Sequence, residues 1–150
     1  MELTTDRCFI RNMKMTDTDD LYQVYSDERV MMYMEPVFDM QRTKEFIQVA
    51  GLCEPPLVYA IVWKITGRVI GHVIFHSYER NDYEIGWILN KDYWGMGIAD
   101  EVTKALIMHD AWELKVVSLN VIQSKLSVKR LQLRMDLYMR AKREILNGID

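Results

Sequence analysis

Apolar residues recur with a strand-like pattern at the start of the chain and with a helical period soon afterwards. The apolar run over 8–11 is short enough to predict an opening strand. Beyond it, Leu21, Val24 and Tyr25 follow one another at spacings of three and four, which predicts a helix with one buried face. Thr16, with an acid three residues further on, is predicted to cap the start of this helix.

Two more helices are predicted before the middle of the chain. The first is a short stretch over 28–33, which Pro36 stops because proline lacks the N–H that a continuing helix needs. The second begins after Asp39, whose carboxylate can accept a hydrogen bond from the first N–H groups of a helix. A loop over 51–56, closed by two prolines, follows it.

The character of the pattern then changes to β-branched and aromatic runs. In chain order it predicts strands over 57–64, 68–76 and 83–89, a helix from 98 to about 114, a strand over 116–122 and a helix over 127–133. Thr66 and Gly67 make the first two strands a hairpin, and the polar stretch 77–82 is expected to be a turn. This order predicts one mixed α/β (α+β) domain that spans residues 1–150.

Composition narrows the class of protein without changing that architecture. Of the 150 residues, 49% are hydrophobic and 27% are charged, which is an ordinary balance for one globular domain. The net charge of −3 and the lack of a long basic stretch argue against nucleic-acid binding and fit a cationic substrate. No apolar run is long enough for a membrane span. Cys8 and Cys53 fit no metal-ligand spacing, so we expect two reduced thiols, no metal site and a cytoplasmic protein.

The segment 94–99, called the glycine loop below, joins a predicted strand to a predicted helix. Gly95 and Gly97 permit positive φ angles and let a ligand approach the backbone without meeting a Cβ atom. The first N–H groups of the following helix have no partner within it, and together with the helix dipole they suit a phosphate. A tight turn that needs glycine for its geometry alone is the other interpretation. No Gly-Lys-Ser/Thr sequence follows, and Asp100 stands where a dinucleotide motif has its third glycine.

Four segments resemble the GCN5-related N-acetyltransferases (GNAT family), and most of all the branch of bacterial ribosomal-protein N-terminal acetyltransferases. Tyr-Glu-Ile-Gly-Trp-Ile-Leu at 83–89 and Tyr-Trp-Gly-Met-Gly-Ile-Ala-Asp-Glu at 93–101 resemble the signature region of the family. Arg-Cys-Phe-Ile-Arg at 7–11 and Gly-His-Val-Ile at 71–74 resemble its opening and its I-G-x-I strand. The resemblance covers about residues 7–131. It implies a mostly antiparallel sheet flanked by helices.

The resemblance implies that acetyl-CoA is the acyl donor and that the glycine loop holds its pyrophosphate. The loop residues that would do so are Trp94, Gly95, Met96, Gly97, Ile98 and Ala99, and the pantetheine arm would pair with the backbone of Trp87, Ile88 and Leu89. Asp92 replaces the Gln or Arg that the family prefers at the start of the loop, which removes a cation on the phosphate side. Lys91 is adjacent and can partly substitute for it.

The implied chemistry is attack by an amine on a thioester, and an amine with a pKa of about 10.4 must first lose a proton. The family resemblance gives Glu84 the role of general base, acting directly or through a water, although a solvent-facing strand glutamate is the alternative. Ser127 and Tyr138 are candidates for stabilising or protonating the leaving thiolate. His72 and His76 share one strand face and can face the cleft, but we expect them to be ordinary strand histidines.

The C-terminal part departs from the family pattern, with Arg134 where a glycine is expected and no room for the last strand. An atypical or shortened C-terminus is therefore predicted, with either a homodimer through the exposed sheet edge or a helical rearrangement. The acceptor is a small-molecule or peptide amine, and Tyr33, Glu35 and Phe38 are candidates for lining its pocket. A coenzyme A-binding module without catalysis is the alternative function, and a purely structural interaction protein is the third.

Overall fold

The computed structural model of the chain describes residues 1–79, 82–109 and 116–119. In chain order the elements are β1 (Glu2–Thr4), β2 (Cys8–Arg11), η1 (Met15–Asp17), α1 (Thr18–Tyr25), α2 (Glu28–Met31), α3 (Met40–Phe46), η2 (Ile47–Gly51), β3 (Val58–Trp63), β4 (Val69–Glu79), β5 (Asp82–Leu89), η3 (Lys91–Tyr93), α4 (Ile98–His109) and β6 (Val116–Leu119). The segments η1 and η3 are single 3-10 turns, and η2 is a π-helical continuation of α3.

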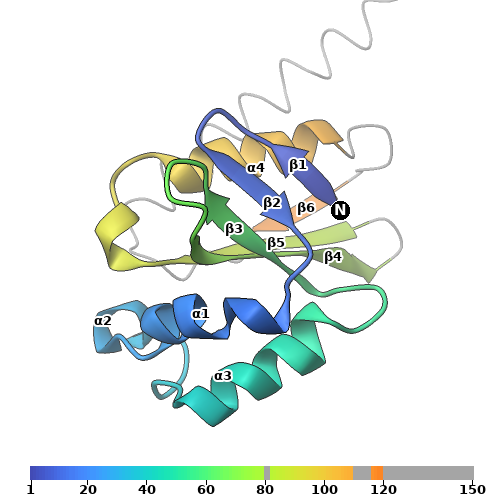
Figure 1. Cartoon of the computed structure of the whole chain (residues 1–150). Coiled ribbons are helices and arrows are strands. Elements are labelled where there is room, and N and C mark those ends of the chain that lie inside the picture. Colours follow the sequence, from blue (N-terminus) through green and yellow to red (C-terminus); the bar gives the residue numbers. More distant parts are fainter. Residues whose placement is uncertain (80–81, 110–115, 120–150) are drawn as a thin grey trace, which may run out of the picture.

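The described strands form a single twisted sheet in the order β1-β2-β3-β4-β5-β6 (Figure 1). Every neighbouring pair from β1 to β5 is antiparallel, whereas β5 and β6 are parallel. The register of the parallel pair runs from Asp82 opposite Val116 to Ile85 opposite Leu119. The predicted mixed α/β domain with a mostly antiparallel sheet is confirmed over the described residues.

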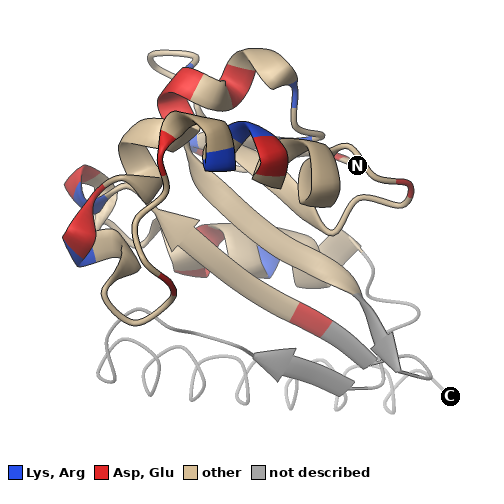
Figure 2. Cartoon of the chain, turned by 90° about the horizontal axis from the view of Figure 1, so that it is seen from below, with Lys and Arg blue, Asp and Glu red and all other residues tan. Residues whose placement is uncertain are grey.

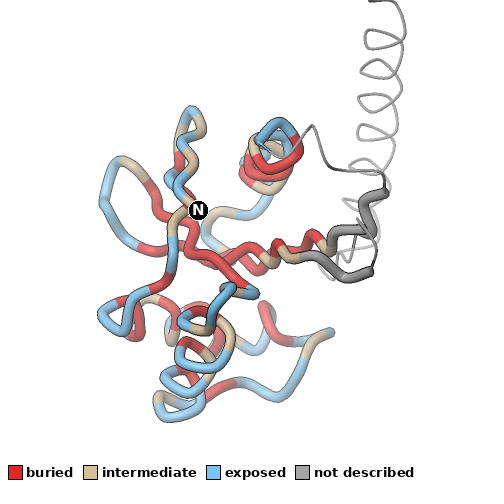
Figure 3. Tube along the Cα trace, turned by 90° about the vertical axis from the view of Figure 1, so that its right-hand side faces the viewer, coloured by how far each residue is buried: buried red, intermediate tan, exposed pale blue. Residues whose placement is uncertain are grey.

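Helices cover both faces of the sheet, because each face carries its own set of apolar side chains. On one face Ile85, Trp87 and Leu89 of β5 pack with Val102 and Leu106 of α4. The opposite face, which holds Ile88, packs against α1, α2 and α3. Buried residues therefore run through the sheet and along the inner sides of the helices (Figure 3). Each fully buried aliphatic side chain contributes about 1.5–3 kcal/mol, so this sandwich holds α4 firmly against β5.

Charged side chains lie mostly on the helices and loops (Figure 2). Asp39 caps α3 as predicted, since its carboxylate accepts from a backbone N–H of the first turn at 2.7 Å. The prediction that Thr16 caps the preceding helix is wrong, because α1 begins at Thr18 after a 3-10 turn. Asp17 closes that turn instead, and its carboxylate accepts from the N–H of Lys14 at 2.8 Å.

Two strand boundaries differ from the predicted ones. The segment 77–82, expected to be a turn, belongs largely to the β4–β5 hairpin, where Ser77 pairs with Tyr83 and Glu79 with Asp82. Polar residues continue these strands because the hydrogen bonds between β4 and β5 are made by the backbone, and they extend to the tip of the hairpin. The first strand, β1, was not predicted, since only Leu3 within it is apolar and three residues carry no readable period.

At Gly71 the backbones of β4 and β5 lie too close together for a side chain. The register of β3 against β4 shifts between Ile61 and Val62, which is a bulge in the ladder just before Gly71. A Cβ atom at Gly71 would lie 2.0 Å from the carbonyl oxygen of Ile88. Only glycine fits there, so this residue allows the strand that leads into the glycine loop to lie flat against β4.

Across the described ranges, none of the helices has the length and apolar character needed to cross a bilayer. The side chains described there include no group of three or more His, Cys, Asp or Glu residues arranged to hold a metal ion. Both cysteines are free thiols, as predicted, and Cys8 is buried. Burial, reinforced by the nearby Glu101 carboxylate, raises the pKa of the Cys8 thiol to about 11, so this thiol is protonated at neutral pH.

Candidate coenzyme-binding site

The glycine loop follows β5 and η3 and includes the first two residues of α4. Gly95 and Gly97 both have positive φ angles, of 75° and 77°, which side chains with a Cβ atom rarely adopt. A Cβ atom at Gly95 would meet nothing within 4 Å, so its glycine is required by the backbone conformation rather than by crowding. The loop is exposed from Trp94 to Gly97, and α4 begins with the buried Ile98.

The backbone of the loop presents a row of hydrogen-bond donors. Within the described part of the chain, the N–H groups of Gly95, Met96, Gly97, Ile98 and Ala99 have no hydrogen-bond acceptor. The internal hydrogen bonding of the helix begins with the N–H of Glu101, which donates to the carbonyl of Gly97 at 3.1 Å. Five donors at the positive end of a twelve-residue helix form a favourable binding site for a phosphate or pyrophosphate.

Two contacts fix the start of the loop. The indole Nε1–H of Trp94 donates to the carbonyl oxygen of Leu89 at 2.9 Å, which ties the loop to the end of β5. Lys91 Nζ forms an ion pair with Asp27 at the N-terminus of α2 and lowers the pKa of that carboxyl to about 2. Lys91 is thus held toward α2, and its predicted role as a substitute cation for the phosphate is not supported by this contact.

The hydrogen bonding of β5 shows which of its backbone groups face away from β4, on the side where β6 pairs with residues 82–85. The N–H of Asn90 donates to the carbonyl of Ile70 on β4 at 2.8 Å. Because bonding alternates along an antiparallel ladder, Ile88 also directs its N–H and C=O to β4. Trp87 and Leu89 direct theirs to the β6 side, where an added strand-like ligand would pair. The backbone groups of Ile88, which we expected to pair with the pantetheine arm, are therefore directed to β4.

Arg7 and Glu101 connect the β1–β2 turn to the glycine loop, and sequence reasoning did not assign them a role there. Arg7 Nη1 donates to the carbonyl of Met96 at 2.8 Å, and Arg7 Nε donates to Glu101 Oε2 at 2.7 Å. Burial alone would raise the pKa of Glu101, but hydrogen bonds from Thr5 and Arg7 outweigh it and hold the pKa of this carboxyl below its ordinary value. Arg7 and Glu101 are 94 positions apart in the sequence, so the pair leaves no local sequence signal.

Glu84 lies on β5 opposite His76 of β4, and the two side chains form a contact. His76 Nε2 and Glu84 Oε2 are 3.3 Å apart, and both side chains are about one quarter exposed, at 24% and 22%. Glu84 lies five residues before Leu89, which corresponds to about 17 Å along an extended strand. The carboxylate is therefore accessible to solvent and ligand, partnered by an imidazole, and on the strand that leads into the glycine loop.

His72 is a core residue, as expected for an ordinary strand histidine. Its side chain is 2% exposed, and its Nδ1 shares a hydrogen bond of 2.6 Å with the hydroxyl of Tyr25. The rings of Tyr25 and Phe46 pack against it at centroid distances of 5.6 and 5.4 Å, and Phe38 packs against those two rings at 5.3 and 6.0 Å. Burial lowers the pKa of His72 to about 3, so the ring is neutral at physiological pH and forms part of the core.

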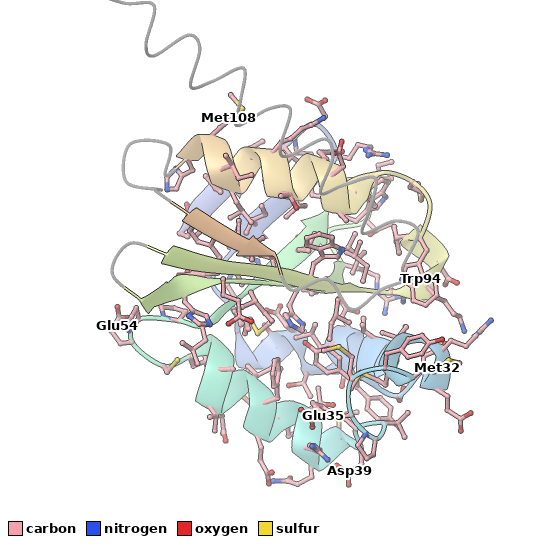
Figure 4. The ribbon with its side chains drawn as sticks, turned by 180° about the vertical axis from the view of Figure 1, so that it is seen from behind. Met32, Glu35, Asp39, Glu54, Trp94 and Met108 are labelled. Atoms are coloured by element: carbon pink, nitrogen blue, oxygen red, sulfur yellow. The ribbon has the colours of Figure 1, made fainter. Side chains whose placement is uncertain are left out.

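A surface hollow of about 630 Å³ lies beside α2, lined by residue 28 and residues 31–37. Tyr33 lines it and is 72% exposed, and Glu35 lines it while paired with Arg42. Phe38, the third residue predicted to line an acceptor pocket, is buried in the aromatic core instead. Trp94 and Met32 lie at the same end of the molecule, where the Lys91–Asp27 ion pair joins the loop to α2 (Figure 4).

Several predicted features lie outside the described residues. They include Ser127 and Tyr138 as candidate acids, the helix over 127–133, the departure at Arg134 and a homodimer through the C-terminal edge. The predicted strand over 116–122 is described only for its first part, as β6, and the predicted helix from 98 only as far as His109.

The chain matches a family of known proteins. Residues 7–136 match the family described as Acetyltransferase (GNAT) domain, and the chain belongs to that family. It is similar to the uncharacterized N-acetyltransferase YnaD of Bacillus subtilis, with 30% identity over 118 residues, 77% of this chain and 69% of that protein. The predicted family and the predicted class of enzyme, an acyltransferase, are thereby confirmed.

Solved structures give the same fold. A GNAT-family acetyltransferase from Bacillus anthracis superposes with a TM-score of 0.72 at 27% identity, covering 79% of this chain and 72% of that one. RimL, a ribosomal L7/L12 alpha-N-protein acetyltransferase solved in complex with coenzyme A, superposes with a TM-score of 0.72 at 15% identity. That match covers 89% of this chain and 82% of RimL, and at this identity it shows the shared fold.

Proposed function

We propose that this protein transfers an acetyl group from acetyl-CoA to a primary amine, with the glycine loop as the binding site of the coenzyme pyrophosphate. The observation that carries the proposal is the row of five N–H groups over residues 95–99, which meet no acceptor within the described part of the chain. Their place at the N-terminus of α4, in a chain of the GNAT family, supports a pyrophosphate as their ligand.

The rest of the coenzyme would follow the edge of β5. Trp87 and Leu89 point backbone groups toward the β6 side, so an extended pantetheine arm can add there like a further strand. The carbonyl of Leu89 already accepts from Trp94, which leaves the carbonyl of Trp87 as the acceptor we assign to the arm. The thioester end would then lie further along β5, toward Glu84.

Glu84 is the general base in this proposal. The acceptor nitrogen attacks the thioester carbonyl carbon, the C–S bond breaks, and the proton of the amine passes to the Glu84 carboxylate, directly or through a water. His76, 3.3 Å from that carboxylate, holds its orientation between the two strands. The leaving thiolate takes up a proton to become the free thiol of coenzyme A, and Ser127 and Tyr138 stay the candidates for supplying it.

The acceptor is a small-molecule or peptide amine, proposed to extend from the hollow beside α2, at the glycine-loop end of β5, to a reacting nitrogen near Glu84. Glu28 and Glu35 give the lining two carboxylates, and among the described residues only Glu35 has an arginine partner, so the described lining carries net negative charge. Exposed Met32 and Tyr33 add apolar surface. An amine with an apolar body matches this combination. We also propose that the enzyme is cytoplasmic, where both free thiols stay reduced, and a homodimer.

A coenzyme A-binding protein without catalysis is the alternative to be excluded, because Lys91, the cation next to Asp92 at the start of the loop, pairs with Asp27. Thiol release from acetyl-CoA with a panel of amines separates the two candidates. We expect coenzyme binding together with turnover on at least one amine, lost in Glu84→Gln. Binding without turnover on any amine would support the alternative, and no binding at millimolar coenzyme would refute both.

A further inference from the structure

Arg7 of the β1–β2 turn contacts both the glycine loop and Glu101 of α4. We infer that Arg7 and Glu101 are positioning residues, which together hold the peptide between Met96 and Gly97 so that its N–H faces the coenzyme. The inference rests on the proposed function, since it takes the glycine loop to be the coenzyme site. Neither side chain is assigned a contact with the coenzyme itself.

The peptide group between Met96 and Gly97 is oriented by Arg7. Arg7 Nη1 donates to the carbonyl oxygen of Met96 at 2.8 Å. In a planar trans peptide the carbonyl and the following N–H point in opposite directions, so the N–H of Gly97 points away from Arg7. The next carbonyl, that of Gly97, accepts from the N–H of Glu101 at 3.1 Å. The peptides on both sides of Gly97 are therefore fixed by contacts behind the loop.

Arg7 is itself held in place by Glu101. Arg7 donates to this carboxylate twice, from Nε to Oε2 at 2.7 Å and from its backbone N–H to Oε1 at 2.8 Å. The Thr5 hydroxyl donates to Oε1 at 2.5 Å, and the N–H of Lys64 donates to the carbonyl of Arg7 at 3.0 Å. The guanidinium is thus held by Glu101 in the first turn of α4, and the backbone of Arg7 is held by Glu101 and by Lys64, just after β3.

The pair also reduces the negative charge near the proposed pyrophosphate site. Glu101 places a negative charge in the first turn of α4, near the N–H groups that would bind an anionic pyrophosphate. The guanidinium of Arg7 neutralises that charge through a direct ion pair, and the Glu101 side chain is only 14% exposed. If Arg7 is removed, the carboxylate repels the coenzyme in addition to releasing the loop, so part of the loss should be recovered when Glu101 is neutralised as well.

The test measures the affinity for coenzyme A by calorimetry, and KM for acetyl-CoA and kcat, in Arg7→Met, Glu101→Gln and the double variant. We expect Arg7→Met to weaken coenzyme binding about tenfold or more, because it removes charge-assisted hydrogen bonds that hold the loop. KM for acetyl-CoA should rise by a similar factor while kcat at saturation changes less than about twofold. The double variant should bind no more weakly than Arg7→Met alone.

Arg11→Met provides the matched control. Arg11 forms an equally regular pair with Asp17, with both contacts at 2.8 Å, at the other end of β2 from Arg7. Its loss should lower the melting temperature and leave coenzyme affinity unchanged. If Arg7→Met loses stability like Arg11→Met but binds coenzyme A as tightly as the wild type, the inference is refuted.

The outcomes separate this inference from the proposed function. Failure of the wild-type protein to bind coenzyme A would overturn the proposed function, whereas equal binding by the wild type and Arg7→Met would overturn only the positioning role. If Arg7→Met does not fold, Arg7→Lys replaces it, since lysine keeps the charge but lacks the fork that reaches Glu101 and Met96 together. Arg7→Lys should then fold and still bind coenzyme A several-fold more weakly than the wild type, and unchanged binding would refute the role.

Discussion

The buried His72–Tyr25 pair predicts an acid-sensitive fold. His72 is 2% exposed, and burial lowers its pKa from 6.5 to about 3. In the unfolded chain the same imidazole takes up a proton below pH 6.5, whereas in the folded protein it stays neutral down to about pH 3. The unfolded state therefore gains protons over this range. His72 therefore does not lower the free energy of unfolding above pH 6.5. Below pH 6.5 it lowers this free energy progressively, until the pH reaches about 3.

The magnitude follows from the two pKa values. One unit of pKa shift corresponds to about 1.4 kcal/mol, and between pH 7 and pH 5 the unfolded histidine becomes almost fully protonated while the folded one does not. The linkage relation gives a loss of about 2 kcal/mol in the free energy of unfolding over this interval from His72 alone. That loss is a large fraction of the stability of an ordinary domain.

Urea unfolding followed by tryptophan fluorescence at pH 7 and pH 5 measures the loss. Tyr25→Phe is the matched control, because it removes the hydroxyl but keeps the buried imidazole, and it should lose the same 2 kcal/mol or so. The double variant Tyr25→Phe with His72→Leu removes the titrating group and leaves no polar partner unpaired, so its loss should be smaller by about that amount. If all three proteins lose stability equally, His72 is not the source and the reasoning is wrong.

Three further predictions concern the site and its support. Gly71→Ala should cost about 2 kcal/mol or more, seen as a lower melting temperature, because its Cβ would meet the Ile88 carbonyl at 2.0 Å; an unchanged melting temperature would contradict the close approach. Glu84→Gln should lower kcat by about 100-fold or more with coenzyme affinity unchanged, and full activity would remove Glu84 as the base. Lys91→Met should change stability by less than about 1 kcal/mol and coenzyme affinity by less than about twofold, because its partner is Asp27; a tenfold weaker affinity would instead make Lys91 a phosphate contact.

Local sequence signals predicted the parts of the site that depend on local conformation. The spacing of Gly95 and Gly97 between a strand and a helix indicated positive φ angles and unpaired N–H groups, and both are present. The cap at Asp39 and the central hairpin are local features of the same kind. Each is determined by a few neighbouring residues, whose types restrict the backbone directly.

Contacts between distant segments left no such signal. The pairing of Arg7 with Glu101 joins residues 94 positions apart, and β1 depends on pairing with β2 rather than on its own pattern. The strand period placed His72 and His76 on one face of the sheet. It could not show that only His72 of the two is buried, by the aromatic rings beneath α1 and α3. Phe38 joined that core instead of the acceptor pocket for the same reason.

A crystal structure of the protein with acetyl-CoA decides whether the glycine loop is the coenzyme site. We expect pyrophosphate oxygens within hydrogen-bond distance of the N–H groups of residues 95–99, and the pantetheine arm along β5 at Trp87, on the side away from β4. We further expect that the carbonyl of Met96 keeps its contact with Arg7 in the complex. A coenzyme bound elsewhere on the molecule, or a pyrophosphate held only by side chains with these N–H groups facing solvent, would contradict this assignment of the site.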